Sequence, residues 1–166
     1  MCRLLPNPRT KIHQIKYIDL DPSSERGEEV LAVSTEDGRI IFFSPKKLQT
    51  ADGIPYGEAV GQLGGRKSGL QGRIKDFEIL TVGDQGFLIV TGGSDGIVRV
   101  WWLRGKDLSS QESSTDVGKL LGFYETGNRI TCLRAFVMLP AEDPMEESED
   151  EEDGAQESSS ESEEDY

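Results

Sequence analysis

Short apolar stretches, several of them alternating with polar residues, recur through the first 139 residues and predict β-strands. The strands expected from this pattern are Lys11–Tyr17, Val30–Val33, Arg39–Phe43, Arg73–Leu80, Phe87–Val90 and Ile97–Leu103, with outer strands at Ala59–Leu63 and Lys119–Tyr124. No segment has a sustained apolar face at helical spacing behind a capping box. The sequence therefore predicts an all-β fold.

Two Asp-Gly turns organise these strands into a repeat. Asp37-Gly38 and Asp95-Gly96 each separate two apolar stretches, and glycine allows the positive φ of a tight hairpin turn. The two turns lie 58 residues apart (96 − 38), and Asn128–Leu133 (NRITCL) matches 72–77 (GRIKDF). Repeats of a few tens of residues with four short strands each are typical of β-propeller blades.

The expected organisation of residues 9–139 is two blades, 9–64 and 72–125, followed by a closing strand at 128–138. The spacing exceeds the roughly 40–45 residues of a WD repeat, and we assign the surplus to enlarged loops at Ser44–Leu70 and Arg104–Asp116. Propellers contain about four to eight blades. We therefore expect the missing blades to come from the rest of a longer protein or from another chain.

Charge separates a tail from this region. The 166 residues have a formal net charge of −13, but 14 of the 31 acidic residues lie in 142–166, which contains no Lys or Arg. Residues 140–166 are rich in Glu, Asp and Ser, and we expect them to be disordered. The remainder has 17 acidic residues (31 − 14) against 18 basic ones, so net charge does not favour docking on nucleic acid.

Two cysteines, Cys2 and Cys132, are far apart in the sequence, which fits a reducing compartment. No apolar run approaches the roughly 20 residues of a membrane span, and the first residues lack a targeting pattern. We therefore expect a soluble intracellular protein with no membrane contact.

The chain resembles one WD-repeat family over about residues 9–137. The resemblance lies in four segments in this order: VLAVSTEDGRIIFF, GRIKDFEI, FLIVTGGSDGIVRVWWL and GNRITCLRAF. The family is that of the p21-activated-kinase-interacting protein and its fungal relative, the maintenance-of-killer WD-repeat factor. The resemblance is to the C-terminal blades, and the order of the segments is its most specific part. It implies a WD-repeat β-propeller that acts as a non-catalytic, nucleolar assembly factor of the large ribosomal subunit.

The partners implied by this resemblance are the pre-60S ribosomal particle, other assembly factors and basic ribosomal-type proteins, and no cofactor is implied. A reported link to p21-activated kinases supplies the alternative function, a signalling adaptor that binds and restrains such a kinase.

The repeat residues that match the family are the turn and strand positions Asp37, Gly38, Phe43, Thr91, Asp95, Gly96 and Trp101. Asp95, Thr91 and Trp101 are the remainder of the internal hydrogen-bond network of a WD repeat. The sequence departs from the pattern at three places. Trp102 stands where Asp is usual, Phe43 replaces the Trp that ends a repeat, and Gln71 and Gly72 precede Arg73 without the usual histidine.

Candidate chemistry is sparse. Gly61–Ser68 (GQLGGRKS) has Arg66 where a phosphate-binding loop requires Gly, and no helix is predicted to follow, so we interpret it as a flexible basic loop. Arg66, Lys67 and Arg73 are candidates for contact with ribosomal RNA. One histidine, His13, and two scattered cysteines cannot supply a zinc site, and Cys132 is expected in the core. No set of catalytic groups is visible, so we expect no enzymatic activity.

Two features stay open at this stage. Trp101 is expected to be buried, whereas Trp102 faces the opposite side of the strand, either packed between blades or exposed to a partner. Ser148, Ser160 and Ser162 each precede an acidic residue by three positions and are candidate phosphorylation sites. The tail either makes a regulated contact with basic proteins or only increases solubility.

Overall fold

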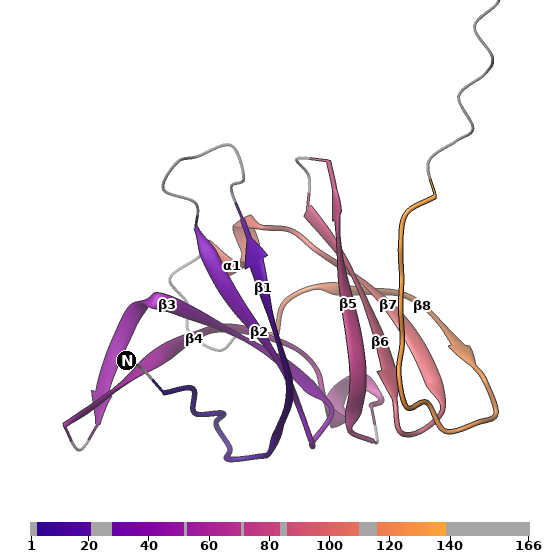
Figure 1. Cartoon of the computed structure of the whole chain (residues 1–166), viewed down its shortest axis with the longest axis horizontal. Coiled ribbons are helices and arrows are strands. Elements are labelled where there is room, and N and C mark those ends of the chain that lie inside the picture. The colour runs from indigo at the N-terminus through magenta and orange to yellow at the C-terminus, as the bar shows by residue number, and fades with distance from the viewer. Residues whose placement is uncertain are drawn as a thin grey trace, which may run out of the picture.

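Two antiparallel four-stranded β-sheets stand side by side (Figure 1). The computed structural model describes residues 3–20, 28–51, 53–70, 72–83, 86–109 and 116–138, so the acidic tail over 140–166 lies outside the described part. Sheet A has the order β1 (Ile12–Asp19), β2 (Glu29–Thr35), β3 (Arg39–Ala51), β4 (Ile54–Gly64). Sheet B has the order β5 (Ile74–Val82), β6 (Gly86–Gly93), β7 (Ile97–Leu103), β8 (Lys119–Glu125).

The prediction of an all-β fold is confirmed. Within the described ranges, the helical structure consists of a turn of 3-10 helix at Arg66–Ser68 and one short helix, α1 (Lys106–Ser109). None of the helices in these ranges is long and apolar enough to cross a membrane.

Residues Ser44–Leu70 differ from expectation. The sequence predicts an enlarged loop here, apart from an outer strand at Ala59–Leu63 that β4 contains. Instead of a loop, β3 continues to Ala51 and pairs with β4 as a long hairpin arm that extends from sheet A (Figure 1). The pairing shifts register between Ser44 and Leu48. Pro45 falls within this irregularity, where the missing N–H of proline removes no ladder hydrogen bond. Reading the Pro-containing stretch as loop was wrong because a bulge accommodates the proline inside a strand.

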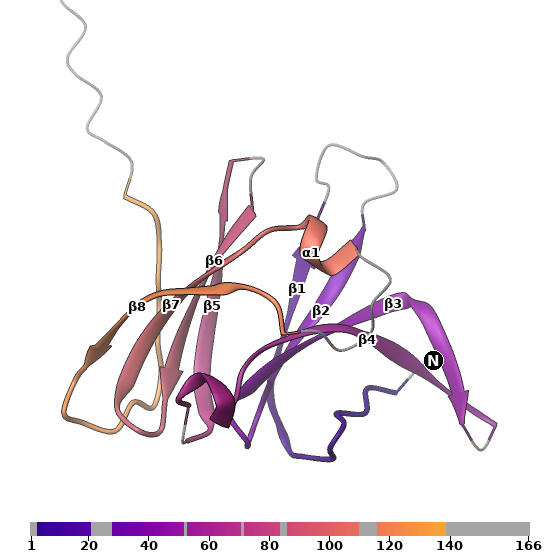
Figure 2. The same ribbon diagram turned by 180° about the vertical axis from the view of Figure 1, so that it is seen from behind.

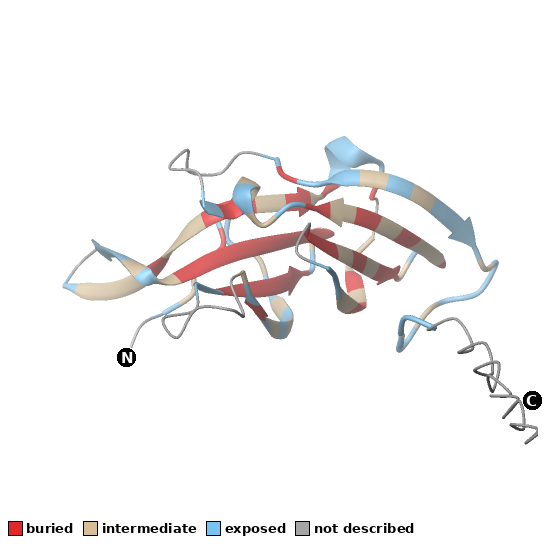
Figure 3. Cartoon of the chain, turned by 90° about the horizontal axis from the view of Figure 1, so that it is seen from above, coloured by how far each residue is buried: buried red, intermediate tan, exposed pale blue. Residues whose placement is uncertain are grey.

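The main hydrophobic core lies between the two sheets, where β5 packs against β1 and β2. Sheet A contributes Ile18, Val30, Ala32, Ile40, Phe42, Val60 and Leu63, and sheet B contributes Ile74, Phe77, Phe87, Ile89, Trp101 and Leu103. Burial is concentrated along the strands that face each other, whereas the arm and β8 are largely exposed (Figure 3). Because each sheet buries one face against the other, the two sheets form one packed unit.

The two sheets repeat each other in detail. The β1–β2 pairing has a bulge between Ile12 and Gln14, and the β5–β6 pairing has one between Ile74 and Asp76. With Ile12 matched to Ile74, Gln14 corresponds to Asp76. The internal repeat expected from the two Asp-Gly turns is therefore present as a structural repeat of four strands.

Residues 128–138 form no strand, contrary to the closing strand expected there. The segment instead runs along β5 (Figure 1), held by side chains rather than by a backbone ladder. The backbone N–H of Leu133 donates to Asp76 Oδ2 at 2.9 Å, and Arg134 pairs with Glu78 at 2.7 Å. Residues 128–133, which match 72–77 in sequence, thus lie beside β5, but the described residues offer them no strand with which to pair.

The connection from β7 to β8 crosses back to sheet A (Figure 2). Leu108 of α1 and Val117 belong to the main core. The backbone N–H of Val117 donates to the carbonyl of Gln62 on β4 at 2.7 Å, and a Cβ on Gly61 would lie 3.0 Å from a Val117 methyl. The described parts of this predicted loop, 104–109 and Asp116, together with Val117 and Gly118, therefore form a strap over β4, the outer strand of sheet A.

Candidate functional site

One end of the two sheets is formed by the β2–β3 and β6–β7 turns and by the segments that contact them. We call it the turn end. Gly38 and Gly96 have φ of 83° and 79°, which glycine adopts without steric cost. A Cβ on Gly38 would lie 2.6 Å from the carbonyl oxygen of Gly72, and a Cβ on Gly96 would lie 2.7 Å from that of Asn128. Both turns thus receive the next segment of the chain at a distance that only glycine permits.

The structure connects two of the three residues assigned to a WD-type network. The indole N–H of Trp101 donates to Thr91 Oγ1 at 3.2 Å, and the Thr91 hydroxyl donates to the carbonyl of Arg99 at 3.4 Å. Asp95 takes no part in this pair and forms an ion pair with Arg99 at 2.9 Å. Arg99 is the residue that Asp95 and Thr91 share, since its side chain pairs with Asp95 and its carbonyl accepts the Thr91 hydroxyl.

Phe43 occupies in sheet A the position that Trp101 occupies in sheet B. It pairs across the ladder with Leu31, as Trp101 pairs with Ile89. Phe43 is buried in a second hydrophobic cluster with Leu31, Val33 and Ile41. Its neighbours are apolar, so sheet A holds this position by packing alone, without an equivalent of the Trp101–Thr91 hydrogen bond.

Two buried arginines, which belong to none of the predicted sites, stabilise the turns. Arg39 donates to Asp37 at 2.8 and 3.1 Å, to Gln62 Oε1 at 3.1 Å, and to the backbone carbonyls of Asn7 and Pro8 at 2.8 and 3.1 Å. The equivalent role in sheet B falls to Arg99, which pairs with Asp95. The signal that could have found them is an arginine two or four residues after each turn aspartate.

The same contacts determine the charge state of Asp37. Burial opposes ionisation, but the hydrogen bonds from Arg39 and Thr35 outweigh it and hold the pKa of Asp37 below its usual value.

Arg99 donates a second hydrogen bond to the carbonyl of Gly69 at 3.2 Å, which ties the segment after β4 to the turn of sheet B. These buried charges therefore position the turns and the segments that meet them.

The basic candidates Arg66, Lys67 and Arg73 lie at this turn end. Arg66 and Lys67 are exposed on the 3-10 turn directly after Gly65, whose N–H donates to the carbonyl of Gly38 at 2.9 Å. Arg73 pairs with Glu36 at 3.2 Å.

Glu36 also lies 2.6 Å from His13. The hydrogen bond with His13, followed by the charges of Arg73 and Lys11, lowers the pKa of Glu36. His13 is therefore half of a surface pair with a carboxylate.

Trp102 lies away from the basic candidates. It is half-buried and lines an open cleft of about 520 Å³ with Arg104, Asp107, Asp116, Lys119 and neighbouring residues. The structure thus groups Trp102 with the strap, apart from Arg66, Lys67 and Arg73. The side chain is half-buried, so packing between blades and exposure to a partner both stay predictions.

The residues in the described ranges contain no group of three or more His, Cys, Asp or Glu that could hold a metal ion. Cys132 is exposed, so the expectation of a small core residue was wrong. The segment that contains it was read as a paired strand, and the absence of that strand leaves the thiol at the surface. Gly61–Gly64 belongs to β4, with the 3-10 turn after it. Ser148, Ser160 and Ser162 lie outside the described residues.

Comparison with known proteins gives no match to a family model, to a curated protein or to a solved structure.

Proposed function

We propose that sheets A and B are consecutive blades of a WD-repeat β-propeller that acts as a non-catalytic scaffold in assembly of the large ribosomal subunit. The observation that supports this most directly is the repeated contact between each turn and the segment that opens the next repeat. Gly38 lies against the carbonyl of Gly72 in the same way as Gly96 lies against the carbonyl of Asn128, at the closely similar distances given above. Contacts of this kind between neighbours, repeated at a fixed period, are the basis of repeat architectures.

The proposal includes further blades beyond sheet B. The exposed large apolar side chains include Phe136 at 76 % and Met138 at 80 % in the segment beside β5. An exposed apolar surface of this kind favours a further packed element. A third sheet, from the rest of a longer protein or from another chain, is the covering that the repeat suggests.

Binding in this proposal occurs on the rims and extended loops, in the nucleus and nucleolus, with pre-ribosomal proteins as the main partners. The acidic residues of 142–166 complement basic ribosomal-type proteins in charge. Phosphorylation of Ser148, Ser160 or Ser162 would add about −1.5 to −2 charges at each site and strengthen such contacts.

The experiment is affinity purification of the tagged chain from nuclear extract, with mass spectrometry and RNA sequencing of the eluate. Co-purification of large-subunit precursor RNA with nucleolar assembly factors is the expected result. A protein kinase in place of ribosomal precursors would reject the scaffold and favour the signalling adaptor. A matched sample of the Leu108→Ala variant, in which the strap is weakened, controls for partners that recognise only unfolded chain.

A further inference from the structure

We infer that the turn end binds single-stranded RNA, with its phosphates on a row of basic side chains and a base on Tyr124. The basic side chains are those of Arg9, Lys11, Arg66, Lys67, Arg73 and Arg129, and we call them the turn-end basic surface. This inference rests on the proposed function only for the choice of RNA as the nucleic acid.

Three of these residues occupy one repeat position. Lys11, Arg73 and Arg129 each directly precede the first isoleucine of their repeat, at Ile12, Ile74 and Ile130. Lys11 and Arg73 precede the first strands of two sheets that face each other, about 10 Å apart, and Arg129 lies in the segment that follows β8. Cations spread over three segments fit an extended polyanion better than a single small anion.

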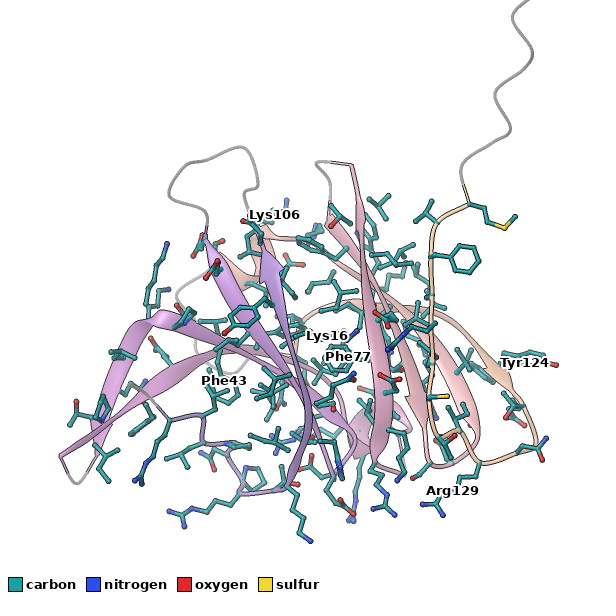
Figure 4. The ribbon with its side chains drawn as sticks, viewed as in Figure 1. Lys16, Phe43, Phe77, Lys106, Tyr124 and Arg129 are labelled. Carbon is teal, nitrogen blue, oxygen red and sulfur yellow. The ribbon has the colours of Figure 1, made fainter. Side chains whose placement is uncertain are left out.

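Contacts place the row at the turn end. The carbonyl of Lys11 accepts a hydrogen bond from the N–H of Glu36 at 2.9 Å, and Arg73 pairs with the same residue. Arg129 follows Asn128, whose carbonyl meets Gly96, and it projects from this end of the molecule (Figure 4).

Arg9 adjoins Pro8, which accepts a hydrogen bond from Arg39, and so extends the row on the sheet A side. Arg66 and Lys67 extend it from the 3-10 turn.

These cations are available to a ligand. In the described part of the chain, Arg9, Lys11, Arg66, Lys67 and Arg129 form no ion pair. Three carboxylates at this end are already engaged, since Glu36 pairs with His13 and Arg73, Asp37 with Arg39, and Asp95 with Arg99. Two more carboxylates lie close by, Asp116 in the cleft that Arg66 and Lys67 line and Glu125 opposite Ile97, and the basic side chains outnumber all five. The local charge at the turn end is therefore positive although the whole chain is strongly acidic.

Four of the six basic residues are arginines, whose planar guanidinium forms two parallel hydrogen bonds to a phosphate or to a carboxylate. The feature that favours RNA over an acidic peptide is an exposed aromatic ring. Tyr124 is 71 % exposed and pairs on β8 with Val98, two residues beyond Gly96, and its ring points outward from the β8 side of the molecule, above Arg129 in the view of Figure 4. Basic side chains together with an exposed aromatic ring are the combination that binds unpaired nucleotides.

The test is fluorescence anisotropy of a labelled single-stranded RNA of about 20 nucleotides, titrated with the full chain at several salt concentrations. The cation variant is Arg66→Gln/Lys67→Gln/Arg129→Gln, in which each residue is exposed. The control is Arg3→Gln/Lys106→Gln/Lys119→Gln, which removes the same charge from exposed residues outside the turn-end basic surface. Tyr124→Ala is the third variant.

We expect the cation variant to weaken binding about tenfold and to reduce the log–log salt slope by about 2, since each phosphate contact on a single strand contributes about 0.7. Tyr124→Ala should weaken binding about tenfold with the slope unchanged, because stacking releases no counterions. The control should bind as the wild type does.

Equal weakening by the cation variant and the control would overturn the inference, as would absence of binding by the wild type at low salt. Displacement of the RNA by poly-glutamate at equal charge concentration would identify an acidic protein segment instead. If RNA binding fails while ribosomal precursors still co-purify with the chain, the turn-end inference is wrong and the proposed function stands. If the chain binds RNA as expected but no ribosomal precursors co-purify with it, the proposed function is wrong and the turn-end inference stands.

Discussion

The side-chain oxygen Oε1 of Gln14 on β1 accepts a hydrogen bond from the backbone N–H of Phe77 on β5, at 3.2 Å. One repeat later, Asp76 Oδ2 accepts the N–H of Leu133 at 2.9 Å. In both cases the residue just past the bulge of one inner strand satisfies a backbone donor of the next repeat. A parallel series links Lys16 to Glu78 at 2.6 Å and Glu78 to Arg134 at 2.7 Å. Side chains rather than a continuous ladder therefore connect successive repeats.

The Asp76 contact predicts a pH dependence. Burial disfavours the charged carboxylate, but the hydrogen bonds from Leu133, Gln14 and Phe77 and the charge of Arg134 lower the pKa of Asp76 below its ordinary 3.8. A lowered folded-state pKa contributes stability above pH 3.8 that is lost as the pH falls through the folded value.

In urea unfolding measured from pH 7 to pH 2, the free energy of unfolding of wild type should exceed that of Asp76→Asn at neutral pH. The difference between the two should become smaller as the pH falls. A constant difference at all pH values would contradict the assignment.

The turn glycines offer a matched pair of substitutions. Gly38→Ala must adopt φ near 83° and also place a methyl group 2.6 Å from the Gly72 carbonyl, whereas Gly53→Ala has φ near 74° with nothing within 4 Å. We expect Gly53→Ala to lower the free energy of unfolding by about 1–2 kcal/mol, the cost of a left-handed alanine. Gly38→Ala should cost clearly more, as measured by thermal and urea unfolding. Equal losses would mean that the close approach to Gly72 is not a constraint.

The Trp101–Thr91 hydrogen bond can be measured by a double-mutant cycle. Trp101→Phe and Thr91→Val each remove one side of the bond and should lower the free energy of unfolding by about 1 kcal/mol beyond any packing change. The double variant should lose less than the sum of the two, since one bond is removed in each case. Additive losses would show that the 3.2 Å contact contributes nothing to stability.

The strap should be essential to sheet A. Leu108 is 2 % exposed and packs on β4, so Leu108→Ala should lower the free energy of unfolding by about 2–5 kcal/mol. Leu48→Ala, at a position 53 % exposed on the arm, is the control and should change stability by less than about 0.5 kcal/mol. The prediction fails if the two variants have the same urea midpoint.

The sequence predicted the all-β class and the strands around both Asp-Gly turns, because alternation and the Asp-Gly pair are local signals. The hairpin arm was missed because Pro45 resembles a loop signal unless the bulge that contains it is known. Arg39 and Arg99 were missed because each has partners from distant segments besides its turn aspartate, among them Asn7, Gln62 and Gly69. The position of Cys132 depended on whether residues 128–138 would find a pairing strand, which is a tertiary property.

Covering β4 with residues that follow sheet B has a consequence for synthesis on the ribosome. The edge of sheet A at Gly61 is covered only when Leu108 and Val117 reach it, more than 40 residues later in the chain. In a nascent chain that has completed β4, Val60 and Leu63 therefore stay partly exposed to water until β5, β6 and β7 have all emerged from the ribosome. The two sheets should consequently mature together late in translation, and a ribosome paused between them would display sheet A as an unfinished, aggregation-prone intermediate.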